Sequence, residues 1–141
     1  MEHVGILKQL VIGSAVIIAT VAIQAEMFAL MTRKHEPVLI WARQKFHRFS
    51  GTAFITVAML MVLLTMTIEV WLWTFVLLAT AAVKALEPAV YFALVCFTTL
   101  GFGDITLPTE WRLLSALIGA NGFLMFGWST AFMVELIRKS R

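Results

Sequence analysis

The chain has 141 residues, of which 61% are hydrophobic and 13% charged, with a mean hydropathy of +0.92. Soluble domains contain only about half apolar residues, so this composition predicts a membrane protein without a separate soluble domain. A bilayer core of about 30 Å needs roughly 20 apolar helical residues per crossing, which leaves room for three crossings and one shorter element. The net charge of +3 comes mainly from basic residues that flank apolar runs, so we expect no nucleic-acid partner.

The first apolar run, over residues 10–31, is long enough to cross a bilayer. It has no small-residue cleavage site after a short apolar core, so we interpret it as a retained span. Residues 32–49 are rich in Lys and Arg, which predicts a cytoplasmic loop by the positive-inside rule. Within this loop, residues 37–49 form either a short amphipathic helix on the membrane surface or a prolongation of the next span. We therefore assign residues 1–48 to an N-terminal span followed by a basic loop.

A second apolar stretch covers residues 49–86, nearly twice the length of one helical crossing. We expect a crossing over residues 51–73, with Trp71 and Trp73 as aromatic anchors at the far interface. Residues 74–87 then form either a helical extension or an apolar turret.

A short helix and a last span follow. Glu87 and Pro88 suit the first turn of a helix, and a helix over residues 88–98 is too short to cross, which predicts a re-entrant segment. The last apolar run, residues 111–137, crosses once more and ends in Arg138, Lys139 and Arg141. With both basic clusters inside, we expect a multi-pass protein of the cell (inner) membrane with its N-terminus outside and its C-terminus cytoplasmic.

The chemistry lies in the loop over residues 99–104. Irregular backbone at membrane depth is tolerated only where it is buried in protein or lines a watery cavity. Gly101 and Gly103 take positive φ without a Cβ penalty, so ordinary and left-handed residues can alternate and aim successive carbonyls at one axis. Four copies would surround a dehydrated K+ with rings of oxygen, so we expect a homotetramer. The expected K+-coordinating residues are Thr99, Leu100, Gly101 and Phe102, with the Thr99 hydroxyl at the cytoplasmic mouth.

Neighbouring residues are expected to support this loop. Asp104 at the outer mouth would concentrate cations and bond to the helix behind the loop. The side chains of Leu100 and Phe102 should turn away from the axis and pack against the short helix. In the last span Gly122, and second Gly127, are hinge candidates, although close helix packing explains Gly122 equally well.

Residues 98–104, Thr-Thr-Leu-Gly-Phe-Gly-Asp, resemble the signature of the potassium channel superfamily, usually T-T-V-G-Y-G-D, at five of seven positions. Residues 111–114 and 126–132 also resemble a family of very small bacterial ion-channel proteins of the two-transmembrane pore class, over about residues 69–137. The resemblance implies a pore domain over residues 49–141. It implies passive K+ conduction without catalysis and without a cofactor other than the permeant ion.

The same resemblance implies supporting residues for the filter. Tyr91 and Phe92 occupy the place of a pore-helix tryptophan pair in many members, and Val95 is apolar as in voltage-gated members. Thr98 and Gly103 complete the support. Phe102 lacks the tyrosine hydroxyl that bonds to pore-helix aromatics in many members.

Two alternatives stay open. The first alternative to a potassium channel is a weakly selective cation channel. The second is a non-conducting membrane protein that regulates another channel. No helix carries regularly spaced arginines, so we expect no voltage sensor of the usual kind. Membrane lipids are expected partners in every case.

Two glutamates lie within the apolar runs. Glu69 is either a functional polar contact behind the short helix or an interfacial residue in water; with Lys84 and Arg112 as possible partners, we favour a structural pair. Glu26 can reach toward the basic loop from the cytoplasmic end of the first span.

Overall fold

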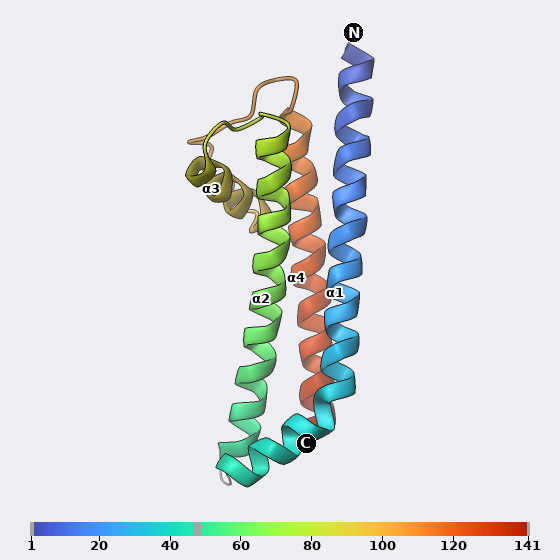
Figure 1. Ribbon diagram of the computed structural model, residues 1–141, viewed down its shortest axis with the longest axis vertical. Helices are drawn as coiled ribbons and strands as arrows, with labels where there is room; N and C mark the ends of the chain where they lie inside the picture. Colours follow the sequence, from blue (N-terminus) through green and yellow to red (C-terminus); the bar gives the residue numbers. More distant parts are fainter. Residues whose placement is uncertain (1, 47–48, 141) are drawn as a thin grey trace.

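The computed structural model describes residues 2–46 and 49–140, and this part of the chain forms four α-helices. Their bounds are Glu2–Phe46 for α1, Ser50–Ala79 for α2, Leu86–Phe97 for α3 and Arg112–Ser140 for α4. The helices α1, α2 and α4 are each long and apolar enough to cross a membrane, and they lie side by side (Figure 1). The helix α3 is short and lies beside one end of this bundle. The predicted all-helical fold with three spans and a short helix before the last span is therefore confirmed.

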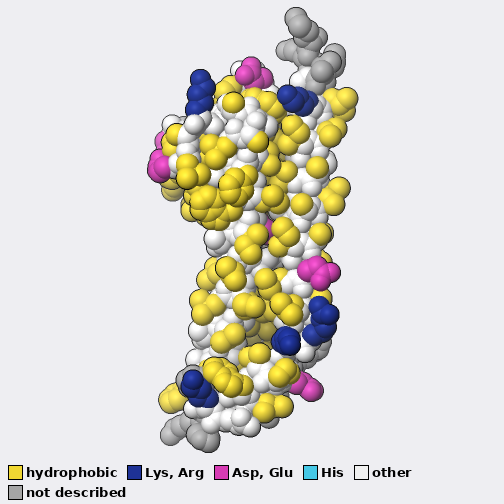
Figure 2. Space-filling model, viewed as in Figure 1, with side chains coloured by type: hydrophobic (Ala, Val, Ile, Leu, Met, Phe, Trp, Pro, Cys, Tyr) yellow, Lys and Arg dark blue, Asp and Glu magenta, His cyan; other side chains and the backbone are white. Residues whose placement is uncertain are grey.

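The chain direction is set by this order of helices. The start of α1, the helix α3 and the loop between α3 and α4 lie at one end of the bundle, and the C-terminus lies at the other (Figure 1). Consequently α1 and α4 are parallel, and α2 is antiparallel to both. Hydrophobic side chains cover most of the face in Figure 2, whereas Lys and Arg side chains gather toward its two ends. This distribution is that of a multi-pass membrane protein.

The basic segment after the first span is helical. The helix α1 continues to Phe46 with Pro37 inside it, so the described part of this predicted cytoplasmic connection is helical, and residues 47 and 48 lie outside the described residues. A proline in a helix interior removes one hydrogen bond and clashes with the preceding turn, which bends the helix. The last part of α1 accordingly turns across the end of the bundle (Figure 1). The segment prolongs the first span and does not prolong the second.

The second span is longer than predicted. The helix α2 continues to Ala79, so residues 74–79 are a helical extension, and a turn with Ala81 at φ 53° leads into α3. Trp73 is fully buried, so its predicted role as an interfacial anchor is wrong. Trp71, two residues earlier, is 39% exposed on the outer face. The two tryptophans point to opposite sides of the helix because two residues correspond to about 200° of rotation.

A buried seam joins α1 to α4. The buried residues of α1 recur every three or four positions and are Gln9, Gly13, Val16, Thr20, Gln24, Phe28 and Met31. This spacing keeps one face of a helix against its neighbour over six turns. The seam is partly polar, and Phe28 closes its far part by stacking on Phe132 with ring centroids 4.0 Å apart.

Between described residues, three hydrogen bonds cross this seam. The polar side chains that make them come from both helices and would be costly to bury in an apolar interface without partners. The bonds run from the Leu113 backbone N–H to Gln9 Oε1 (2.9 Å), from Thr20 Oγ1 to Asn121 Oδ1 (3.1 Å) and from Gln24 Nε2 to Ser129 Oγ (2.6 Å). The first span is thus bonded to the last span along much of its length.

Glu69 lies in the interior of α2. It is fully buried, and neither carboxylate oxygen has a hydrogen-bond partner among the described residues. Lys84 and Arg112 are both exposed at the end of the bundle where α3 lies, so the expected pair with Glu69 is wrong. Glu26, by contrast, is exposed on the outer face of α1.

Candidate functional site

The helix α3 brings the Gly-rich loop to the side of the bundle. It has twelve residues, which is about 18 Å of helix and too little to cross a bilayer. Glu87 in its first turn suits the positive end of the helix dipole. Its buried face, which includes Phe92 and Phe97, packs into the core that α2 and α4 complete. The loop therefore leaves from a fixed helix end within the apolar thickness of the molecule.

The end of α3 forms a Schellman motif. The Thr99 N–H donates to Cys96 O (2.9 Å), and the Leu100 N–H donates to Val95 O (3.0 Å), which is the bond pattern of this C-terminal cap. The motif requires a left-handed residue after the cap, and Thr99 supplies it with φ 61°. The Gly101 N–H also approaches Val95 O, at 3.3 Å. The start of the loop is thus held by the last turn of the helix.

Every second residue of the loop is left-handed. The φ angles are 61° at Thr99, 57° at Gly101 and 78° at Gly103. Glycine takes this conformation freely, but it is a genuine outlier for a β-branched residue such as Thr99 and costs of order 1–3 kcal/mol. The predicted positive φ at both glycines is confirmed, and the strained threonine was not foreseen. An alternation of this kind turns successive carbonyls toward one side of the backbone, as a cation ladder requires.

The loop makes few contacts with its own chain. Leu100 is 61% and Phe102 66% exposed, so the expectation that both pack against the short helix is wrong for a single chain. A Cβ added at Gly101 or Gly103 would meet no atom within 4 Å. The apolar side chains and the backbone of the loop are therefore left open to a neighbouring molecule.

One hydrogen bond ties the end of the loop to α3. The Tyr91 hydroxyl donates to Asp104 Oδ2 at 2.7 Å, so the structure brings these two expected support residues together. This bond, helped by backbone N–H groups of residues 104 and 105, lowers the pKa of the Asp104 carboxyl below its ordinary value. The same bond raises the pKa of the Tyr91 hydroxyl, because it stabilises the protonated form. Asp104 consequently stays charged over the neutral range.

A cavity of about 330 Å³ separates the loop from the helices behind it. Its lining includes Tyr91 and Val95 of α3, both loop glycines, and Arg112 and Ser115 of α4. Thr98, at the helix end, instead donates its hydroxyl to Leu94 O at 2.7 Å. Arg112 and Ser115 were not foreseen at the site, because nothing in their sequence context distinguishes them from ordinary residues at the start of a span.

The hinge candidates differ in their surroundings. A Cβ on Gly122 would overlap the carbonyl oxygen and carbon of Phe97, the last residue of α3. Gly119, one turn earlier, is also close, with its added Cβ 3.4 Å from Cys96 O. A Cβ on Gly127 would meet nothing within 4 Å. Glycine is thus required at Gly122 for close packing against the end of α3, whereas Gly127 has no such contact in its chain.

Comparison with known proteins agrees with this geometry. Residues 53–139, which cover more than half of the chain, match a family described as "Ion channel". No curated protein and no solved structure matches the chain. The matched region extends from α2 through the loop to the end of α4 and leaves out α1. The chain belongs to the ion channel family.

Proposed function

We propose that the chain is one subunit of a potassium-selective channel, in which the backbone carbonyls of Thr99, Leu100, Gly101 and Phe102 coordinate K+. The observation that carries this proposal is the left-handed conformation at alternate residues of the loop, in a chain of the ion channel family. Carbonyl oxygens that replace the hydration shell are the established basis of K+ selectivity in such filters. No covalent chemistry is involved, and conduction is passive.

A homotetramer completes this site. One chain contributes a single strand of carbonyls, and a closed ring around an ion needs four. The exposure of Leu100 and Phe102 supports this assembly, because large apolar side chains at a functional loop indicate an unpartnered interface. The side chains Phe123 and Leu124, 71% and 59% exposed on α4, offer further apolar contact surface.

The proposed orientation places the filter outside. Arg33, Lys34 and Lys45 of α1 and Arg138 of α4 are exposed and belong to the basic segments predicted to be cytoplasmic. The loop and Asp104 belong to the opposite end of the bundle, where a carboxylate attracts cations to the outer mouth. The short helix then ends toward the middle of the membrane, where its negative dipole end favours a cation. In a bacterial cell the membrane would be the inner membrane.

Ion flux into vesicles tests the proposal. Purified protein in liposomes should pass K+ and Rb+ and exclude Na+, and it should migrate as a tetramer in detergent. Gly101→Ala should abolish the flux and leave the assembly intact, because alanine resists the left-handed conformation. Gly51→Ala is the matched control, since its Cβ also meets nothing within 4 Å but lies outside the loop.

Other outcomes identify the alternatives. Equal flux of Na+ and K+ would indicate a weakly selective cation channel. Absence of flux from a folded tetramer would favour a non-conducting regulatory protein, and flux unchanged by Gly101→Ala would refute the assignment of the filter.

A further inference from the structure

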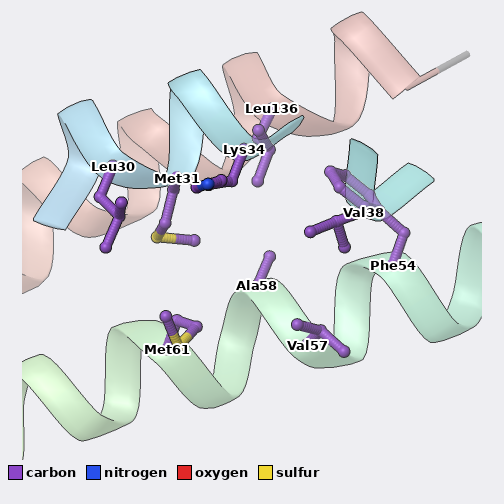
Figure 3. A pocket seen from close by; sticks show the side chains of 9 residues that line it. All are labelled: Leu30, Met31, Lys34, Val38, Phe54, Val57, Ala58, Met61 and Leu136. Atoms are coloured by element: carbon purple, nitrogen blue, oxygen red, sulfur yellow. The ribbon is translucent and has the colours of Figure 1, made fainter. Parts of the chain in front are cut away.

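A cavity of about 270 Å³ lies between α1 and α2 at the end of the bundle away from the filter. Figure 3 shows side chains of both helices pointing into it, with Leu136 of α4 behind them. Among the described residues the lining is apolar apart from one lysine; these residues are Leu30, Met31, Lys34, Val38, Phe54, Val57, Ala58, Met61 and Leu136. An apolar cavity that opens on the outside of a membrane bundle borders on lipid, not on water.

The depth of this cavity matches the boundary of the bilayer core. Lys34 is the last residue of the first candidate span, and Gly51 is the first residue of the second. Ala58 and Met61 lie seven and ten residues further into α2, which is about 10–15 Å deeper at 1.5 Å per residue. An acyl chain that enters beside Lys34 would therefore extend along the cavity toward the membrane interior.

The charge at the entrance is positive and uncompensated by the lining. Lys34 is the single charged residue among the described residues that line the cavity. Its aliphatic stem can lie along the apolar wall while its ammonium group stays at the headgroup level. The ion pair found among the described residues joins Arg138 to Glu135 and leaves Lys34 out. An acyl chain below and a cation above are complementary to a lipid with an anionic headgroup.

A second hollow adjoins the first. It has a volume of about 400 Å³, shares Val57 with the first, and is bordered by Trp41 and Phe49. Lys45 lies over the Trp41 ring, 5.2 Å from its centroid, and adds another cation beside an apolar surface. Trp and Lys at such a level are typical of a membrane interface. Two adjacent apolar hollows suit the two chains of a phospholipid.

We propose that the α1–α2 cavity binds one acyl chain of an anionic phospholipid, with the lipid phosphate at Lys34. One wall of the site comes from α1, which lies outside the segment that matches the ion channel family, and the rest comes from α2 and α4. Because α1 is also bonded to α4, an occupied cavity would stabilise the arrangement of the three spans. This inference is independent of whether the loop conducts.

Lipid retention tests this site directly. The full chain is reconstituted with equimolar phosphatidylglycerol and phosphatidylcholine, extracted gently into detergent, and analysed by native mass spectrometry for bound lipid. The wild type should retain phosphatidylglycerol in preference to phosphatidylcholine. Lys34→Gln should weaken this preference about five-fold, the effect of one cation near the surface, and Lys34→Arg should restore it. Lys84→Gln, an exposed lysine at the filter end, is the matched control and should leave it unchanged.

A second experiment fills the cavity with a larger side chain. Ala58→Phe places a ring in the acyl site and should lower retention of both lipids, whereas Leu60→Phe adds similar bulk on the outer face, where Leu60 is 59% exposed. The proposal is overturned if the wild type shows no preference, or if Lys34→Gln retains phosphatidylglycerol as the wild type does. Equal retention by Ala58→Phe and Leu60→Phe would also overturn it and would indicate that a neighbouring chain covers the cavity.

Discussion

Replacement of Gly122 by alanine tests how the last span supports the proposed filter. The new methyl group would overlap the backbone carbonyl of Phe97, which ends α3 two residues before the strained Thr99. A backbone carbonyl cannot rotate away as a flexible side chain can, so either α3 or α4 must move. We expect the filter to be displaced along with the end of α3.

Comparison with a second glycine of α4 gives the size of the loss of stability caused by the overlap. Gly127→Ala adds the same methyl group to the same helix, where it meets no atom within 4 Å. Both variants gain about 1 kcal/mol in helix propensity, so this gain cancels when they are compared. Overpacking of a tight contact costs about 1–3 kcal/mol, which should make Gly122→Ala less stable than Gly127→Ala by that amount. The difference corresponds to a factor of about 5–150 in the unfolding equilibrium.

Two measurements on each variant decide the matter. Thermal unfolding in lipid nanodiscs reports stability, and vesicle flux reports conduction. Gly122→Ala should lose both stability and conduction, whereas Gly127→Ala should retain its stability. If the two variants unfold alike, the contact between Gly122 and Phe97 does not limit the packing. If only Gly127→Ala loses conduction while it stays stable, Gly127 acts as the hinge.

Three further substitutions remove a hydrogen bond or a buried carboxylate. Gln24→Leu removes the bond to Ser129 and should cost about 1 kcal/mol of stability in lipid, measured by thermal unfolding; an unchanged melting temperature would contradict a stabilising seam. Tyr91→Phe removes the bond that lowers the pKa of Asp104, so this pKa should rise toward its ordinary value. A lowered pKa keeps the carboxylate charged until lower pH, so conduction of the variant should decline at a higher pH on the filter side than that of the wild type; identical pH profiles would refute the role. Glu69→Gln removes a buried carboxylate without a partner, so its melting temperature should equal or exceed that of the wild type, and a large decrease would reveal a stabilising ionic contact.

The short helix and the Gly-rich loop could be predicted well because their signals are local. Residues 86–104 combine a helix too short to cross with two glycines two positions apart, and backbone conformation there depends on the residues themselves. A bond from Asp104 to the short helix could be predicted because Tyr91 and Asp104 belong to this one segment. The left-handed Thr99 was not foreseen, because a β-branched residue gives no local signal for positive φ and takes it only through the cap at the end of α3.

The sequence by itself determined the membrane class, the three spans, the short helix and the Gly-rich loop, since hydropathy and glycine spacing report directly on these features. The tertiary structure decided which faces of the spans meet. Lipid is as apolar as a helix interface, so an apolar span carries no stripe that shows its buried side. Trp73 inside the bundle, the polar seam between α1 and α4, and the contact of Gly122 with Phe97 therefore emerged only from the packing. The continuation of α1 through Pro37 also depended on this packing, because proline alone predicts a break.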